Sequence, residues 1–160
     1  MSFVDVYLGL GSNLGDRKAH LEEALRRLDA AFGVPCKAVS GWMESEAWGF
    51  EGAAFLNGCA LYRLPRRAPA EEHALWILDR CKEVERSLGR LEDGETDAEG
   101  KRVYHDRTID IDILFYGKEI IENQRLVIPH PWISERDFVR RPLAQIAKPA
   151  VKAAFPELFD

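Results

Sequence analysis

The sequence predicts an α+β fold in which an antiparallel sheet carries two helices on one face. Apolar side chains recur at every second position within residues 3–10 (Val4, Val6, Leu8, Leu10) and 107–117 (Ile109, Ile111, Ile113), and this period of two is typical of strands. Residues 16–32 and 69–88 repeat apolar side chains at helical spacing. Further strands are predicted over residues 36–44 and 55–64. The resulting order, β-α-β-β-α-β, is the split β-α-β pattern of ferredoxin-like folds.

The turn GSNLGD, residues 11–16, leads from the first strand into the first helix. Its two glycines, with Asn13 or Asp16 as the helix cap, favour a tight turn and a helix that Gly33 ends. Because Gly11 has no side chain, the backbone there can approach a ligand closely. The turn lacks the GxxxxGK(S/T) and GxGxxG spacings, so it indicates a phosphate loop only weakly.

The rest of the chain adds two loops, a hairpin and a C-terminal helix. Residues 46–54 and 91–102 contain glycines and are expected to be loops, the second of them polar and mobile. A hairpin is expected over residues 119–128, and a helical tail from Ser134 that Pro142 interrupts. The sheet face away from the two main helices is then expected to be free for a site that the loops roof.

Composition and charge exclude several classes of protein. The 160 residues suggest one domain, residues 1–160, without the apolar run of roughly 20 residues that spans a membrane. The net charge of −5 argues against general nucleic-acid binding, so phosphate chemistry would need local arginines or a metal. Cys36, Cys59 and Cys81 lack a CxxC spacing, which argues for buried thiols rather than a zinc site or disulfides. The N-terminus has no signal-peptide pattern, so the cytoplasm is the expected compartment.

Asp110 and Asp112 are the candidate metal ligands. In the predicted strand they point off the face opposite Ile111, about 7 Å apart along the chain. Aspartate is depleted in strand interiors, and two like charges on one side of a strand repel unless water or a cation separates them. Mg²⁺ held by carboxylates and substrate phosphates would supply that cation. The alternative is two solvated carboxylates on an exposed face, which is the more common case for an isolated DxD pattern.

Four arginines flank this strand beside turns or loops and form a candidate phosphate grip: Arg90, Arg107, Arg125 and Arg136. The planar guanidinium matches a phosphate with two parallel hydrogen bonds. Lys101 and Arg102 add positive charge in the loop just before the strand. Each arginine alone is more often a solvated surface charge, so the prediction depends on the group.

Two further segments carry candidate ligand-binding side chains. Phe55 and Asn57 share one face of their strand, where a phenyl ring can stack on a heteroaromatic ring while the amide bonds its edge. His130 lies between two prolines in VIPHP, a stiff segment from which it can hydrogen-bond a phosphate or a ribose. The alternatives are an asparagine that satisfies a neighbouring loop and a histidine that caps the hairpin end.

Titratable side chains in the predicted helices indicate no chemistry by themselves. Glu85, near the end of the second helix, has the simple alternative of a surface charge, and His20 and His73 are expected at helix surfaces. His105 and Asp106 adjoin the candidate arginines, but their spacing fits no metal motif.

Five motifs occur in one order along the chain: GLGSNLGD, FLNG, ERSLGR, RTIDIDILFYG and RLVIPHPWISERDFVRRPL. Together they resemble the 6-hydroxymethyl-7,8-dihydropterin pyrophosphokinase family of folate biosynthesis, over almost the whole chain. The R-x-x-D-x-D-x-L motif paired with PHP is the most specific of these signals. The resemblance implies an enzyme that transfers the β,γ-pyrophosphoryl group of ATP to the hydroxymethyl oxygen of the pterin and releases AMP.

The resemblance also implies roles for individual residues. Asp110 and Asp112 resemble the ligands of two Mg²⁺ ions, and Arg90 and Arg107 resemble catalytic arginines that grip the triphosphate. The residues that resemble the family's pterin site are Gly11, Ser45, Glu46, Trp48, Phe55, Asn57 and Phe138. The residues that resemble its ATP contacts are Glu85, Arg102, Arg125, His130 and Arg136.

The expected partners are ATP and the hydroxymethyl pterin, with no nucleic acid and no membrane, and the chain is expected to be a monomer. Two rival interpretations stay open. A non-catalytic ferredoxin-like module that binds a small ligand explains the fold but gives the aspartates and arginines no task. A family member that binds pterin without turnover is suggested by Glu92, where many members carry a basic residue.

Overall fold

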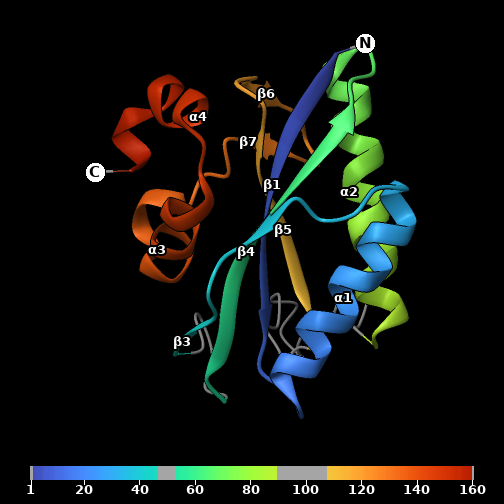
Figure 1. The fold of residues 1–160 in the computed structure, drawn as a ribbon, viewed down its shortest axis with the longest axis vertical. Helices are drawn as coiled ribbons and strands as arrows, with labels where there is room; N and C mark the ends of the chain where they lie inside the picture. The colour runs from blue at the N-terminus through green and yellow to red at the C-terminus, as the bar shows by residue number, and fades with distance from the viewer. Residues whose placement is uncertain (1, 47–52, 90–107, 160) are drawn as a thin grey trace, which may run out of the picture.

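The computed structural model describes residues 2–46, 53–89 and 108–159, and its centre is a five-stranded antiparallel sheet. The strands lie in the order β2-β4-β1-β5, and β3 also pairs with β4 (Figure 1). Their bounds are β1 Phe3–Ser12, β2 Ala38–Val39, β3 Met43–Ser45, β4 Phe55–Pro65 and β5 Asp110–Tyr116. The predicted mixed fold with an antiparallel sheet is confirmed, although the strand expected over residues 36–44 is split into β2 and β3.

Two helices, α1 (Arg17–Phe32) and α2 (Ala70–Ser87), lie together on one face of the sheet (Figure 1). α1 begins where the Asp16 carboxylate accepts a hydrogen bond from the Ala19 N–H at 3.1 Å. It ends at Gly33, whose φ of 74° is a left-handed conformation that glycine adopts without strain. Both helices therefore form where the apolar spacing predicted them.

The main core lies between the sheet and these two helices. β1 contributes four buried residues at alternate positions: Val4, Val6, Leu8 and Leu10. β5 likewise contributes Ile111 and Ile113, and Ile109, directly before the strand, continues the same alternation. Because successive side chains of a strand point to opposite faces, the residues between them, including Asp110 and Asp112, face away from the helices.

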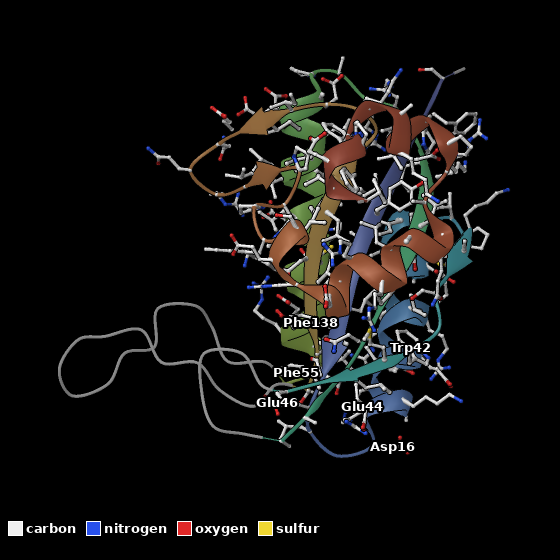
Figure 2. All side chains as sticks on the ribbon, turned by 90° about the vertical axis from the view of Figure 1, so that its left-hand side faces the viewer. Asp16, Trp42, Glu44, Glu46, Phe55 and Phe138 are labelled. Atoms are coloured by element: carbon white, nitrogen blue, oxygen red, sulfur yellow. The ribbon has the colours of Figure 1, made fainter. Side chains whose placement is uncertain are left out.

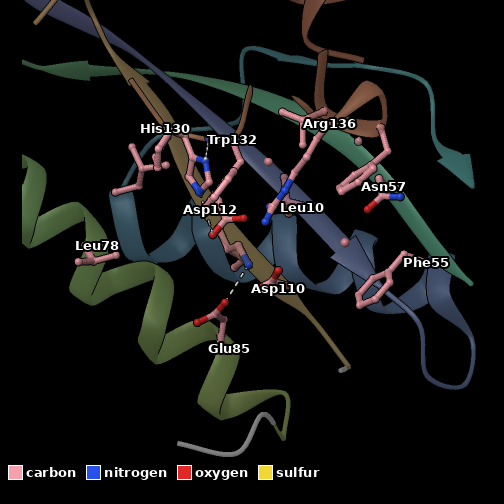
Figure 3. A pocket seen from close by; sticks show the side chains of 18 of the residues that line it. Leu10, Phe55, Asn57, Leu78, Glu85, Asp110, Asp112, His130, Trp132 and Arg136 are labelled. Atoms are coloured by element: carbon pink, nitrogen blue, oxygen red, sulfur yellow. Dashed lines mark hydrogen bonds and ion pairs between the residues drawn. The ribbon is translucent and has the colours of Figure 1, made fainter. Parts of the chain in front are cut away.

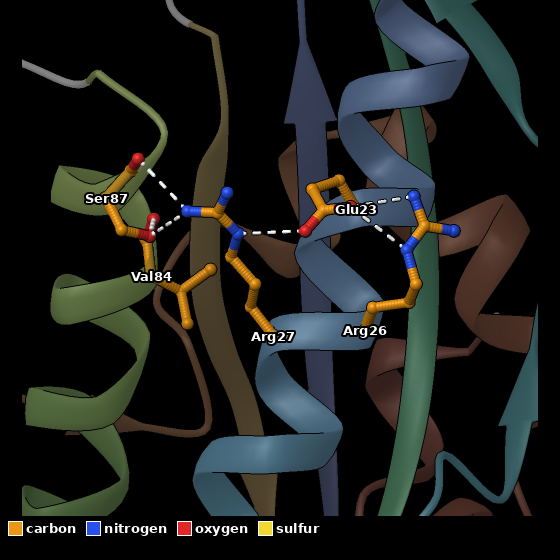
Figure 4. A network of polar contacts seen from close by, with 5 residues as sticks. All are labelled: Glu23, Arg26, Arg27, Val84 and Ser87. Atoms are coloured by element: carbon orange, nitrogen blue, oxygen red, sulfur yellow. Dashed lines mark hydrogen bonds and ion pairs between the residues drawn. The ribbon is translucent and has the colours of Figure 1, made fainter.

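Arg27 ties the C-terminal end of α2 to α1 (Figure 4). Its Nη1 donates to the Ser87 carbonyl oxygen at 3.1 Å and to the Ser87 Oγ at 2.8 Å, while its Nε donates to Glu23 at 2.9 Å. Hydrogen bonds from Arg27 and then Arg26 lower the pKa of the Glu23 carboxyl. The last turn of α2, which carries Glu85, is therefore held against α1.

The C-terminal segment covers one end of the opposite sheet face. It comprises the helices α3 (Asp137–Ile146) and α4 (Pro149–Ala154) and the 3-10 helices Ile133–Glu135 and Pro156–Leu158. The preceding hairpin of β6 (Ile121–Glu122) and β7 (Val127–Ile128) instead contributes Ile121 and Ile128 to the main core. A second core forms beneath the C-terminal segment from Tyr7, Cys59, Leu61, Leu114, Phe115, Ile133, Leu143, Val151 and Phe155. The prediction that this whole face is free was wrong, because the C-terminal segment buries the apolar side chains at one end of the face. The pocket lies at the other end.

Two local predictions also differ from the structure. Pro142 lies inside α3 instead of interrupting the helical tail, and burial of its ring offsets the missing backbone donor. His73 is 4% exposed rather than at the surface, because its Nδ1 pairs with the Tyr116 hydroxyl at 2.7 Å. The three cysteines are free thiols, with Cys59 and Cys81 buried and Cys36 half-buried. Among the described residues, no helix has the length and the apolar character needed to cross a membrane.

Candidate active site

A pocket of about 460 Å³ opens on the sheet face away from α1 and extends past the edge of β5 to α2 (Figure 3). Asp110 and Asp112 lie at its middle, and its lining divides into two parts on either side of them. The ring lobe is lined by Gly11, Ser45, Glu46, Phe55, Asn57 and Phe138. The hairpin lobe is lined by Leu78, Lys82, Gln124, Arg125, Leu126, Val127, His130, Pro131 and Trp132.

Asp110 and Asp112 are aligned with glycines of the neighbouring strand. Asp110 pairs with Gly11 and Asp112 pairs with Gly9 in the antiparallel register of β5 and β1. Residues paired in this way carry their side chains on the same face, so the glycines leave room beside both carboxylates. The Asp112 side chain accordingly stays 37% exposed. The prediction that both carboxylates share one face is confirmed.

The two carboxylates fit a hard divalent cation that is shared with a bound ligand. Mg²⁺ is usually held by one or two carboxylates and completes its octahedron with water and substrate phosphate. Within the described ranges, no group of three or more His, Cys, Asp or Glu side chains is arranged to hold a metal ion. The donor set therefore suits an ion that arrives with a phosphate better than a permanent structural ion.

Asn57 is oriented by β3 and turns its carbonyl oxygen toward the ring lobe. Its Nδ2 donates to the Met43 carbonyl oxygen at 3.2 Å and to the Ser45 Oγ at 2.8 Å. Both amide hydrogens are directed to β3, so Oδ1 is the acceptor on the lobe side. A Cβ added at Gly11 would lie 2.9 Å from this Oδ1, which places the oxygen directly over the glycine.

Gly11→Ala is expected to weaken the binding of a flat heterocyclic ligand about tenfold, because overpacking costs on the order of 1–3 kcal/mol. The new Cβ would lie 2.9 Å from the Asn57 Oδ1 and 3.3 Å from the Phe55 ring. Gly41→Ala is the matched control, since its Cβ would meet the Gln145 Oε1 at 3.5 Å, an ordinary contact. A fluorescence titration measures both affinities. Equal affinities in the two variants would contradict this description of the lobe.

Phe55 and Phe138 approach the ring lobe from different elements. Phe55 begins β4 and Phe138 lies in the first turn of α3, and Figure 2 shows both at the same end of the sheet. Two aromatic side chains that line one lobe can hold a flat ring between them. The Arg136 Cζ lies 5.8 Å from the Phe138 ring centre and 6.0 Å from the Trp132 ring centre, so its guanidinium bridges the two lobes.

His130 is a neutral hydrogen-bond donor beside Asp112. Its backbone N–H donates to the Leu114 carbonyl oxygen at 3.1 Å, and the Trp132 N–H donates to its Nδ1 at 3.2 Å. Burial, assisted by the positive charge of Arg136, lowers the pKa of His130 to about 4. Because Nδ1 accepts a hydrogen bond, the single proton of the neutral ring sits on Nε2. This Nε2 lies 3.9 Å from the Asp112 Oδ1.

The neutral His130 should make stability depend on pH. Its pKa is about 4 in the folded chain, against about 6.5 when unfolded. The unfolded chain therefore binds the extra proton between these values, and the free energy of unfolding falls as the pH drops from 6.5 toward 4. Between pH 7 and pH 5, His130→Gln should lose on the order of 1–2 kcal/mol less stability than the wild type. Urea unfolding at both pH values measures this, and equal losses would contradict it.

Arg125 and Glu85 line the pocket but are engaged with protein groups. The Arg125 Nη2 donates to the Asp79 carboxylate at 2.5 Å, and both side chains are about half exposed. Glu85 is 3% exposed, and its Oε2 accepts a hydrogen bond from the Ile111 N–H at 2.8 Å. The alternative of Glu85 as a surface charge was therefore wrong, because the end of α2 lies against the edge of β5.

Sequence reasoning missed Leu78 and Lys82, which line the hairpin lobe from α2. With Glu85 they stand at positions i, i+4 and i+7, so one stripe of the helix faces the pocket. That spacing was the available signal once Glu85 had been singled out. The Asn13 amide was also missed as a contact: it donates to the Ala53 carbonyl oxygen at 3.0 Å and ties the first turn to the segment before β4.

Four of the predicted site residues lie outside the described residues: Trp48, Arg90, Arg102 and Arg107. Most of the loops predicted over residues 46–54 and 91–102 also lie outside them. The other predicted site residues, from Gly11 on β1 to Phe138 on α3, all line the pocket. The structure thus brings together side chains that are far apart in the sequence.

Comparison with known proteins gives a consistent result. Residues 7–148 match the family model described as 7,8-dihydro-6-hydroxymethylpterin-pyrophosphokinase (HPPK). A 2-amino-4-hydroxy-6-hydroxymethyldihydropteridine pyrophosphokinase of Porphyromonas gingivalis is 41% identical over 144 residues, 89% of this chain and 90% of that protein. Proteins of the same name from Aquifex aeolicus and Bacillus subtilis are 36% and 33% identical, over 88% and 92% of this chain and 79% and 81% of theirs.

Proposed function

The chain belongs to the 7,8-dihydro-6-hydroxymethylpterin-pyrophosphokinase family, and we propose that its pocket works with Mg²⁺ held by Asp110 and Asp112. The protein transfers pyrophosphate from ATP to hydroxymethyldihydropterin in folate synthesis. The observation that carries the proposal is the position of the two carboxylates between the two lobes of the pocket (Figure 3). With the pterin in one lobe and the nucleoside in the other, the phosphates would pass the aspartates.

Two Mg²⁺ ions are assigned to this pair of aspartates, as the family resemblance implies. The room that Gly9 and Gly11 leave beside the carboxylates supports the assignment. Bound there with ATP, Mg²⁺ would neutralise charge on the phosphates that react. The task of Asp110 and Asp112 is to hold that positive charge beside the transferred group.

The ring lobe is assigned to the pterin. Phe55 and Phe138 would hold the flat ring between them, and the Asn57 Oδ1 would accept a hydrogen bond from an N–H group on its edge. This arrangement directs the hydroxymethyl group toward the aspartates. Further pterin contacts are assigned to Gly11, Ser45, Glu46 and Trp48.

The hairpin lobe is assigned to ATP. His130 would donate from Nε2–H to a phosphate or ribose oxygen, and Arg125 and Arg136 would bind phosphate through their guanidinium groups. The family resemblance alone supports the remaining assignments, which are a catalytic grip on the triphosphate by Arg90 and Arg107 and further ATP contacts by Glu85 and Arg102.

The reaction places two demands on these residues. The hydroxymethyl oxygen attacks the β-phosphorus and AMP leaves, so negative charge on several phosphates must be stabilised at once. The two substrates must also be held so that the hydroxymethyl oxygen is in line with the β-phosphorus. Two lobes on either side of the aspartates would hold them in this way. Arg125, Arg136 and the aspartate-bound cation would meet the first demand, and the stacked ring and Asn57 would meet the second.

We further propose that residues 1–160 form one domain of the ferredoxin-like class that acts as a cytoplasmic monomer and binds no nucleic acid. The strand order β2-β4-β1-β5 and the shared use of β1, β4 and β5 by both cores support a single unit of that class. The net charge of −5 supports the absence of nucleic-acid binding. Size-exclusion chromatography with light scattering tests the monomer.

Release of AMP tests the proposed mechanism. Purified protein with ATP, Mg²⁺ and hydroxymethyldihydropterin should form AMP and pterin diphosphate in equal amounts, measured by chromatography and mass spectrometry. Excess EDTA should stop the reaction, and added Mg²⁺ should restore it. A non-catalytic module would form neither product, and a member without turnover would bind pterin but release no AMP. Activity that persists in EDTA would refute the metal assignment.

A further inference from the structure

The outer edge of β5 needs a hydrogen-bond acceptor, and Glu85 supplies it. β5 is the last strand in the order β2-β4-β1-β5, so one edge pairs with β1 and the other faces the end of α2. Edge strands present unpaired backbone groups, and a buried N–H without an acceptor is costly. The Glu85 Oε2 accepts the Ile111 N–H at 2.8 Å (Figure 3).

The bonded amide lies between the two candidate metal ligands. The Ile111 N–H belongs to the peptide that joins Asp110 to Ile111, and Asp112 follows directly. The Ile111 side chain is 4% exposed and packs into the main core, so the carboxylates on either side project from the opposite face. A hydrogen bond that holds this peptide plane therefore restrains the backbone from which both carboxylates project.

Burial of the Glu85 carboxylate costs free energy. Glu85 is 3% exposed, and a buried carboxylate is costly unless it is hydrogen-bonded. It also lies near two further negative charges, those of Asp110 and Asp112. Yet Glu85 does not join them in a metal-holding group of three, since the described residues contain none. The Glu85 carboxylate instead accepts a hydrogen bond from the backbone of β5, the strand that carries the two aspartates.

We propose that Glu85 is a positioning residue that aligns Asp110 and Asp112 for the cation through its hydrogen bond to the Ile111 amide. Arg27 supports this role, because it holds the last turn of α2 by its bonds to Ser87. The inference rests on the proposed metal role of the aspartates. This positioning role is separate from the ATP contact assigned to Glu85 above, because it acts on the cation through the two aspartates.

Metal affinity measured without turnover tests the inference. Mn²⁺ replaces Mg²⁺ as the probe, and electron paramagnetic resonance counts free Mn²⁺ with the protein and a non-hydrolysable ATP analogue. Glu85→Gln keeps an acceptor oxygen, whereas Glu85→Leu removes it and Glu85→Asp keeps the charge but shortens the reach. Glu83→Leu is the matched control, because Glu83 lies on the exposed side of α2 and pairs with Arg80.

Glu85→Leu and Glu85→Asp should each weaken Mn²⁺ binding at least about tenfold, as loss of a residue that supports a metal ligand typically does. Glu85→Gln and Glu83→Leu should stay within about threefold of the wild type. In steady-state assays, the first two should lower kcat at saturating ATP and Mg²⁺, which a general loss of stability in a still folded protein does not do. Circular dichroism confirms folding, and Glu85→Asp keeps the test decisive if Glu85→Leu does not fold.

Each other outcome overturns a defined statement. Wild-type Mn²⁺ affinity in Glu85→Asp, together with a loss in Asp110→Asn, would overturn the positioning role and leave the proposed metal site intact. Equal losses in Glu85→Gln and Glu85→Leu would show that the charge of Glu85 matters rather than its hydrogen bond, and would also overturn it. Wild-type affinity in Asp110→Asn would instead refute the metal site itself.

Discussion

Asp112→Asn is expected to reduce kcat/KM for AMP formation at least about a thousandfold, which corresponds to roughly 4 kcal/mol of lost transition-state stabilisation. Asparagine has the same size as aspartate but no charge, so it cannot hold a cation beside the phosphates. The fold should survive, because the side chain is 37% exposed and stands opposite Gly9 rather than in either core. Asp110→Asn should behave in the same way, since it stands opposite Gly11.

Asp5→Asn is the matched control for this prediction. Asp5 lies on β1, and its carboxylate pairs with the Lys148 Nζ at 3.1 Å, away from the pocket lining. Its side chain is 28% exposed, so an exchange of the same kind at a similar depth should leave kcat/KM within about threefold. A coupled assay of AMP formation and a thermal melt measure activity and folding. Substantial turnover in Asp112→Asn would remove the basis of the proposed mechanism.

The elements of the fold were predictable because their signals are local. The alternation of Val4, Val6, Leu8 and Leu10 is itself the buried face of β1, and the Asp16 cap and Gly33 stop of α1 act within one helical turn. The alternation around Asp110 and Asp112 likewise fixed the face on which both carboxylates project. Patterns of this kind need no knowledge of the partner segment.

The covering of the second sheet face depends on contacts between segments far apart in the chain. Tyr7 and Phe115 are buried by Val151 and Phe155, and no local period indicates which segment will cover them. His73 was misjudged for the same reason, because its partner is the Tyr116 hydroxyl on β5. The partners lie far apart in the chain: His73 and Tyr116 are 43 positions apart, and Tyr7 and Lys148 are 141 positions apart.

The site was predictable in its residues but not in its geometry. Sequence motifs named Asp110, Asp112 and Asn57, and all three line the pocket. The alignment of the aspartates with glycines of β1 depends on strand register, and a shift of one residue would replace those glycines with other side chains. The hydrogen bond from the Ile111 amide to Glu85 depends in turn on where α2 ends against β5.

The orientation of Asn57 leads to the second large effect. Asn57→Leu is expected to weaken pterin binding roughly a hundredfold, because the ring would lose a buried acceptor while its own N–H group stayed unpaired. Leucine has the same branched arrangement of side-chain heavy atoms, so the change to the outline of the lobe should be limited. The affinity for a non-hydrolysable ATP analogue should change by less than about threefold, since the hairpin lobe is built from α2 and residues 124–132.

Loss of the Asn57 amide also frees two groups of β3, the Met43 carbonyl oxygen and the Ser45 Oγ. Ser45→Ala separates this effect from pterin recognition, because it removes one partner of the amide and keeps Oδ1 above Gly11. We expect Ser45→Ala to weaken pterin binding far less than Asn57→Leu, by no more than about tenfold. Calorimetric titration of each variant with pterin in the presence of the ATP analogue gives the comparison. Comparable losses in both variants would mean that Asn57 acts by holding β3 in place, and the assignment of its oxygen to the pterin edge would be wrong.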